Sequence, residues 1–104
     1  MTTATNDPTT LTIRYRLRPE SVERHLELLR AVHDELAAVR PPGLRWESFR
    51  HDDEVTFLDL LRVDRPGQLS RLTAWPAFRG GLDARCDEPP VIAELEPLAA
   101  YGPA

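Results

Sequence analysis

Apolar and polar residues alternate strictly from Leu11 to Leu17. Successive side chains of a strand point to opposite faces, so this segment is predicted to be a half-buried strand. Its odd-numbered residues face the core, and its even-numbered residues, Arg14 and Arg16 among them, face the other way. The first eight residues show no periodicity and are predicted to be a loose leader, with structure beginning near Thr9.

A helical repeat comes next, because apolar residues recur every three or four positions from Val22 to Val39. Pro19 has a backbone φ that suits a first helical turn, and Pro41-Pro42-Gly43 ends the pattern. We therefore predict a helix from about Pro19 to Val39.

Two further strand-like segments, Leu44 to Arg50 and Val55 to Val63, are separated by the polar residues His51 to Glu54. Short apolar runs joined by a polar loop of this length are typical of a hairpin. The two segments are predicted to pair antiparallel.

A second helix is expected near Pro76, since apolar residues recur at helical spacing around it while the proline interrupts any helix before it. Gly80-Gly81 lies inside this helix, a weakness that is tolerated where another backbone comes close. Val91 to Leu95 is predicted to be a last strand, which can resume beyond Pro97 toward Tyr101.

The predicted order is β-α-β-β-α-β, which is typical of a ferredoxin-like α+β fold with a four-stranded antiparallel sheet. The two helices cover only one face of such a sheet, so the other face meets solvent or a partner. Tyr15, Trp46 and Phe57 supply more large apolar surface than one face of so small a sheet readily hides. A homodimer is therefore expected.

Composition limits the class of protein. The chain has 104 residues, 41% of them hydrophobic, which suits a single domain over residues 9–104. No apolar run approaches the ~20 residues needed to span a bilayer, and the N-terminus lacks the features of a secretory signal. One cysteine, Cys86, cannot form an internal disulfide and is expected to be a small buried hydrophobe. We expect a cytoplasmic protein.

The formal net charge is −4, and basic and acidic residues are interleaved along the chain. This pattern argues against nucleic acid or a membrane as the partner. Phosphate-binding glycine loops and the Gly-x-Ser-x-Gly and Cys-x-x-Cys motifs are absent from the sequence.

Three segments, TLTIRYRLRPES, ELAAVRPPGLRWESFR and LTAWPAFRGGLDARC, carry a resemblance to a known family. Together with the last strand they make residues 9 to 101 resemble the dimeric α+β barrel superfamily, and within it the antibiotic-biosynthesis-monooxygenase-like domains. The resemblance implies two ferredoxin-like protomers whose sheets close into one barrel. It also implies oxidation of an aromatic or quinol substrate by dioxygen without metal or flavin, or a related cyclisation of a polyketide-like molecule.

The chain departs from this family around the turn before the second helix. Many quinol-monooxygenase-like members have histidines there, whereas this chain keeps only Pro76 and Phe78 of a Pro-x-Phe pattern. The haem-degrading members use Asn, Trp and His together, but no histidine follows His51 and the only asparagine is Asn6. Haem oxygenation is therefore set aside.

Two histidines lie on the first predicted helix, His25 near the centre of its apolar face and His33 at the border. Eight residues separate them by roughly 12 Å, which is too far for one zinc ion, so no metal site is expected. The family resemblance implies that no cofactor is needed. His25 is either a general base toward a phenol or quinol or a hydrogen-bonded core residue.

Asp59 places a carboxylate in the middle of an otherwise apolar strand face. It either meets Arg14 or Arg16 as a structural ion pair, or lines a pocket with a raised pKa as an acid or base.

Residues that could bind a small aromatic or hydrophobic substrate share an expected position near the sheet or the second helix. They are Tyr15, Trp46, Phe57, Trp75, Phe78, His33 and Arg14. The aromatic residues at these spacings are equally consistent with a plain core, and Arg14 could clamp an anionic substrate or face the dimer partner.

Two functions remain open. The first is a cofactor-independent monooxygenase or cyclase with His25 and Asp59 as catalytic residues, and the second is a non-catalytic homodimer that binds a small ligand or serves as a scaffold. On either hypothesis, His25 and Tyr15 are predicted to border whatever cavity exists.

Overall fold

The computed structural model describes residues 8–65 and 67–102. Residues 1–7 of the predicted leader lie outside this range, and Pro8 is exposed. The main elements are β1 Thr9–Arg16, α1 Val22–Val39, β2 Leu44–Arg50, β3 Thr56–Val63, α2 Trp75–Gly80, α3 Leu82–Arg85 and β4 Val91–Leu95. Two short 3-10 turns, Pro19–Ser21 and Leu69–Arg71, precede α1 and α2.

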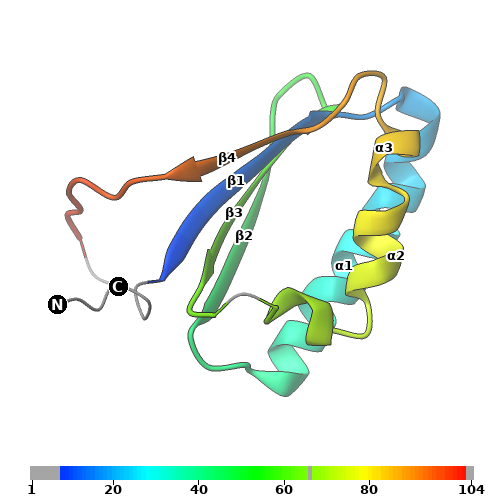
Figure 1. The fold of residues 1–104 in the computed structure, drawn as a ribbon. Coiled ribbons are helices and arrows are strands. Elements are labelled where there is room, and N and C mark those ends of the chain that lie inside the picture. The colour runs from blue at the N-terminus through cyan, green and yellow to red at the C-terminus, as the bar shows by residue number, and fades with distance from the viewer. Residues whose placement is uncertain (1–7, 66, 103–104) are drawn as a thin grey trace, which may run out of the picture.

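The four strands form one antiparallel sheet in the order β2-β3-β1-β4. All helices lie on one side of this sheet, and its other face is open (Figure 1). The predicted ferredoxin-like β-α-β-β-α-β fold is confirmed.

The long helix α1 presents its apolar stripe to the sheet through His25, Leu28, Leu29 and Val32, which are all buried. It ends at Arg40, whose left-handed backbone (φ 52°) lets its N–H bond the carbonyl of Leu36. The helix predicted from Pro19 to Val39 is therefore confirmed, except that its first three residues form the 3-10 turn.

The second predicted helix is broken in two. We expected Gly80-Gly81 to lie inside it, but α2 ends at Gly80 and α3 begins at Leu82. The close approach at this point comes from a side chain and not from a backbone, because a Cβ built on Gly81 would lie 2.8 Å from Nη1 of Arg85. The break makes room for the guanidinium of Arg85, which folds back toward α2.

The helix-facing side of the sheet holds the core. Ile13, Tyr15, Trp46 and Phe57 are each at most 7% exposed and pack beneath the helices with residues such as Phe78. Our reason for expecting a dimer is therefore wrong, because a single protomer already buries the side chains of Tyr15, Trp46 and Phe57.

The open face of the sheet carries a different set of apolar residues. Strand pairing aligns Phe49, Leu58, Arg14 and Val91 in one row across it. Phe49 is 49% exposed and Val91 60% exposed. The surplus of apolar surface thus exists, but on the face that the helices leave uncovered.

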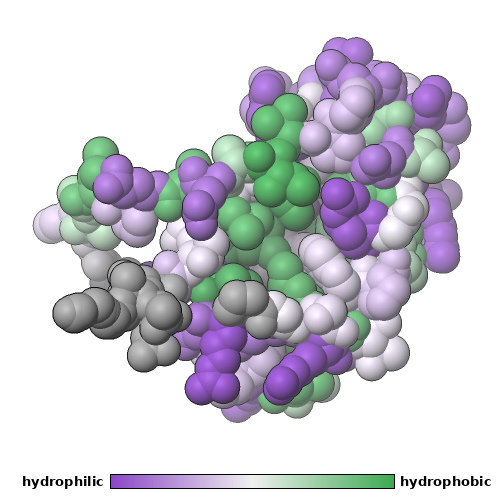
Figure 2. All heavy atoms as spheres, viewed as in Figure 1, coloured by the Kyte–Doolittle hydropathy of each residue, from purple (hydrophilic) through white to green (hydrophobic). Residues whose placement is uncertain are grey.

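The chain beyond β4 runs away from the helix layer as an extended segment (Figure 1). The predicted strand toward Tyr101 is not formed, since residues 96–101 have no strand assignment and Leu98 and Tyr101 are fully or almost fully exposed. Figure 2 shows hydrophobic residues also gathered in a hollow between the sheet and the helices. On this side β4 forms the sheet edge and Ile92 is half exposed.

Candidate functional site

Asp59 is fully buried on the helix-facing side of β3, where it lies opposite Ile13 of β1. The hydroxyl of Tyr15 donates a 2.7 Å hydrogen bond to Oδ2, and the indole N–H of Trp46 donates a 3.3 Å bond to Oδ1. The expected ion pair with Arg14 or Arg16 is wrong, because both arginines project from the opposite face. Arg16 instead pairs with Asp87 at 2.9 Å.

His25 of α1 is also fully buried, and both of its ring nitrogens are engaged. Nε of Arg85 donates to Nδ1 at 3.2 Å, and Nε2 lies 2.8 Å from the hydroxyl of Tyr15. Nδ1 accepts a hydrogen bond and is therefore unprotonated, so a neutral ring carries its proton on Nε2. Nε2 then donates to Tyr15, whose own hydroxyl proton points at Asp59.

Arg85, which the sequence analysis did not single out, is the positive end of this chain of bonds. It is 8% exposed, and its terminal nitrogen Nη2 donates a 2.6 Å bond to the carbonyl of Phe78. A signal was present in the sequence, because Phe78, Leu82 and Arg85 follow one another at spacings of four and three residues. This spacing puts the arginine on the apolar side.

Burial dominates the electrostatics of this network, defined here as Asp59, Tyr15, His25 and Arg85. It lowers the pKa of His25 to about 4, with the nearby Arg85 charge as the second cause. Burial also raises the pKa of Asp59, although hydrogen bonds from Ser48, Tyr15 and Trp46 act in the opposite direction. The pKa of Tyr15 is raised by burial first and by Asp59 second.

Aromatic rings enclose the network. The Phe57 ring stacks on Tyr15 with centroids 5.7 Å apart and meets His25 edge-on at 5.2 Å. Phe78 lies 5.4 Å from both His25 and Trp46. The charges and polar groups of the network therefore sit in surroundings of low polarity, where electrostatic interactions are strong.

The predicted site residues separate into three groups. Six of them, His25, Asp59, Tyr15, Trp46, Phe57 and Phe78, meet in the core. Trp75 and His33 are half-buried at its rim, with Trp75 5.7 Å from Trp46 and His33 Nε2 2.9 Å from the hydroxyl of Ser48. Arg14 lies on the opposite face of the sheet.

Glu35 of α1, a second residue that the sequence analysis missed, holds the segment that covers this core. Its carboxylate accepts hydrogen bonds from the backbone N–H groups of Thr73 and Ala74 at 2.7 and 2.8 Å. These bonds lower the pKa of Glu35. They tie the start of α2, and with it Trp75, to α1.

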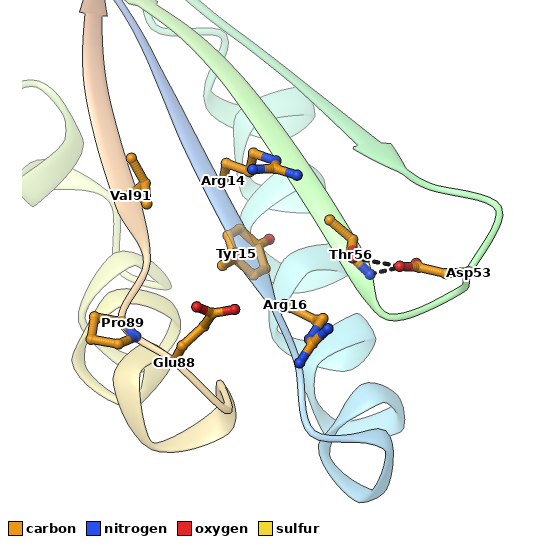
Figure 3. A pocket seen from close by; sticks show the side chains of 8 residues that line it. All are labelled: Arg14, Tyr15, Arg16, Asp53, Thr56, Glu88, Pro89 and Val91. Carbon is orange, nitrogen blue, oxygen red and sulfur yellow. Dashed lines mark hydrogen bonds between the residues drawn. The ribbon is translucent and has the colours of Figure 1, made fainter.

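Two surface pockets were found, and neither opens the network to solvent. One of about 330 Å³ is lined by residues that include Arg14, Tyr15 and Glu88 (Figure 3). The other, of about 570 Å³, lies near Glu35 and Leu72. The prediction that Tyr15 and His25 border a cavity between the first helix and the sheet is therefore wrong for these two pockets. The pocket that Tyr15 lines lies on the face of Arg14 and Val91, and His25 lines neither pocket because its side chain is fully buried.

Within residues 8–65 and 67–102, no group of three or more His, Cys, Asp or Glu side chains is placed to hold a metal ion. None of the helices in that part of the chain is both long and apolar enough to cross a membrane. Cys86 is buried, as predicted.

The sequence and the fold of the whole chain were compared with those of known proteins. No family model matches the sequence, and no curated protein matches it either. The structure of Rv0793 from Mycobacterium tuberculosis superposes with a TM-score of 0.72 at 17% identity, covering 92% of this chain and 100% of that one. A candidate antibiotic biosynthesis monooxygenase from Bacteroides thetaiotaomicron gives 0.73 at 12% identity, with 94% and 96% covered.

SnoaB, a cofactor-independent oxygenase from Streptomyces nogalater, gives a TM-score of 0.64 at 16% identity, with 90% and 96% covered. The chain has the antibiotic biosynthesis monooxygenase-like fold. The resemblance seen in the sequence is thereby confirmed at the level of the fold. Because the identities are below 20%, the activity has to be argued from the residues of the site.

Proposed function

We propose that this protein is a homodimeric, cytoplasmic, cofactor-independent monooxygenase or related cyclase acting on a planar phenolic, quinol or polyketide-like molecule. The observation that carries the proposal is the buried network of Asp59, Tyr15, His25 and Arg85 inside an aromatic enclosure. Burying four ionisable groups is costly, and perturbed pKa values of this kind concentrate at functional sites.

The proposed oxidation requires a base that removes a proton from the substrate and a group that carries this proton. Both nitrogens of His25 are occupied, so the proposal gives the basic role to the Asp59 carboxylate and makes Tyr15 the group that shuttles the proton. Removing a proton from a phenol, or from the carbon of its keto tautomer, makes an electron-rich anion that can react directly with dioxygen.

The overall reaction balances without an added reductant. Dioxygen adds to the deprotonated carbon to give a hydroperoxide, which takes up the abstracted proton. Loss of water then leaves a carbonyl on that carbon. The substrate supplies all four electrons, one oxygen atom enters the product, and the other leaves as water.

Entry to the network requires its cover to move. Trp75 and Phe78 of α2 close the aromatic enclosure beside Trp46, and this six-residue helix is tied to α1 through Glu35. A planar ligand that displaced Trp75 and Phe78 would stack on Trp46 and reach Asp59 and Tyr15. This geometry favours flat aromatic substrates over aliphatic ones.

The test is oxygen uptake by chelator-treated, flavin-free protein with dihydroxynaphthalenes and anthrone as probes. We expect the wild-type protein to accelerate uptake over buffer, and Asp59→Asn to lower the rate by about a hundredfold or more. Asp87→Asn is the matched control, because it makes the same change in an exposed carboxylate outside the network. No acceleration by the wild type, or full activity of a folded Asp59→Asn variant, would contradict the proposal.

A second candidate function is a non-catalytic homodimer that binds a small hydrophobic ligand or serves as a scaffold. It is favoured by one observation: among the described residues every buried side-chain nitrogen and oxygen already has a hydrogen-bond partner. On this alternative, Asp59→Asn lowers the melting temperature, while oxygen uptake equals that of buffer for both proteins.

A further inference from the structure

The buried carboxylate of Asp59 has a second set of neighbours that leads toward solvent. Ser48 of β2 is directly opposite Asp59 in the pairing of β2 with β3, so the two side chains share one face of the sheet. The hydroxyl of Ser48 lies 2.9 Å from Nε2 of His33 on α1. His33 and Ser48 are both half-buried, whereas Asp59 is fully buried.

The directions of these bonds are consistent with one another. A serine hydroxyl has a single proton, and an ionised Asp59 carboxylate, which Ser48 faces directly across the strand pair, attracts that proton. Nε2 of His33 is then the donor to Ser48. Asp59 therefore has three polar neighbours: it accepts hydrogen bonds from Tyr15 and Trp46, and it faces the hydroxyl of Ser48 across the strand pair.

Only one of these three branches leaves the core within the described residues. The Trp46 branch stops at a buried indole, and the Tyr15 branch ends at Arg85, which is 8% exposed and does not give up its proton. The Ser48 branch ends on the half-buried imidazole of His33, a ring that can take up a proton at one nitrogen and release one from the other.

We propose that Ser48 and His33 form a proton route between the buried Asp59 carboxylate and solvent. In the inward direction Ser48 passes its hydroxyl proton to Asp59 and takes the Nε2 proton of His33, which recovers one from water. The outward direction reverses each transfer, so that protons balance and no electron moves. The route would reset the base of the proposed function, but its existence does not require that function.

The test follows the hydroxyl proton of Tyr15, which is bonded to Asp59, by proton NMR. Its signal is assigned by its loss in Tyr15→Phe, and its exchange with water is compared in wild type, Ser48→Ala, Ser48→Thr and His33→Gln. We expect Ser48→Ala and His33→Gln to slow the exchange by about tenfold or more, since each removes a transfer step. Ser48→Thr keeps a hydroxyl and should exchange at close to the wild-type rate.

A purely structural role for Ser48 predicts the opposite sign, because loosened packing speeds the exchange of buried protons. Exchange in Ser48→Ala that is as fast as in the wild type, or faster, overturns the proposal. If the wild-type proton exchanges too fast to be seen, it must become visible in Ser48→Ala, and its continued absence overturns the proposal equally. His33→Gln supplies the same comparison if Ser48→Ala does not fold. The measurement needs no substrate, so it fails or succeeds independently of the oxygen-uptake assay.

Discussion

At the scale of single residues, the core is organised by one buried negative charge and one buried positive charge. Asp59 and Arg85 do not touch but are joined through Tyr15 and His25, which remain neutral. Each hydrogen bond has a defined donor, so the network has one direction, from Arg85 to Asp59. Removing one charged end would leave the other unpaired in the core, which typically costs about 3–5 kcal/mol.

Lowering the pH is expected to destabilise the protein through His25. Burial lowers the pKa of this residue from 6.5 to about 4. Between these values the unfolded chain binds a proton that the native state does not, so the free energy of unfolding falls as the pH drops through this window. The loss amounts to about 3 kcal/mol once the pH is below 4.

The measurement is chemical denaturation of wild type and His25→Gln between pH 7 and pH 4. The glutamine keeps a donor for Tyr15 and leaves Asp59 in place; the raised pKa of Asp59 acts with the opposite sign in both proteins. The stability advantage of the wild type over the variant should shrink as the pH falls. A difference that stays constant with pH would show that His25 does not titrate as the structure implies.

Burial of these residues could be predicted from the sequence, but their partners could not. Helical phase placed His25 on the apolar face of α1, and alternation placed Asp59 among apolar residues of β3. Alternation does not fix which face of one strand matches which face of the next. The observed register sets Asp59 opposite Ile13, which puts Arg14 on the far side of the sheet.

At the scale of elements, the helix layer consists of one long helix and two short ones that depend on side-chain contacts. α2 has six residues and α3 has four, too few to be stable alone. Glu35 fixes the start of α2, and Arg85 joins α3 to α2 through the carbonyl of Phe78. Pro76 predicted where this region starts. The break at Gly81 could not be predicted, because it depends on the contact between Gly81 and the guanidinium of Arg85 in the folded structure.

Gly81→Ala is expected to destabilise the fold by about 1–3 kcal/mol, the usual cost of disturbing a buried hydrogen bond to a charged group. The added Cβ would lie 2.8 Å from Nη1 of Arg85 and displace the guanidinium that bonds His25 and Phe78. Gly80→Ala is the matched control, because nothing lies within 4 Å of a Cβ at that position. Equal unfolding midpoints for the two variants in denaturant would contradict this account of the break.

At the scale of the whole molecule, the helices protect one face of the sheet and leave the other to solvent. Leu58 and Leu60 are half-buried near the middle of this open face, and Phe49, Val91 and Leu95 are exposed around them. Arg14 lies between Leu58 and Val91 on this face, so the apolar area has a charged residue within it. A monomeric protein seldom exposes a large apolar area that polar residues border, and such areas mark interaction sites. The excess was predicted from Tyr15, Trp46 and Phe57, which lie buried on the other face. Only the observed pairing shows which side each strand turns to the helices.

The last prediction is that two copies join through these open faces. A two-fold interface brings the same patch of each protomer together, and a stable one buries more than ~1,000 Å² in total. Light scattering at micromolar concentration should give twice the mass of the chain for the wild type and the mass of a single chain for Leu58→Arg, whose charge would be buried beside the like charge of Arg14 in the interface. Val39→Arg is the control, since this residue is 59% exposed at the end of α1, away from the open face. A monomeric wild type would exclude the barrel, and a dimeric Leu58→Arg would place the interface elsewhere, most directly on the extended segment that carries Leu98 and Tyr101.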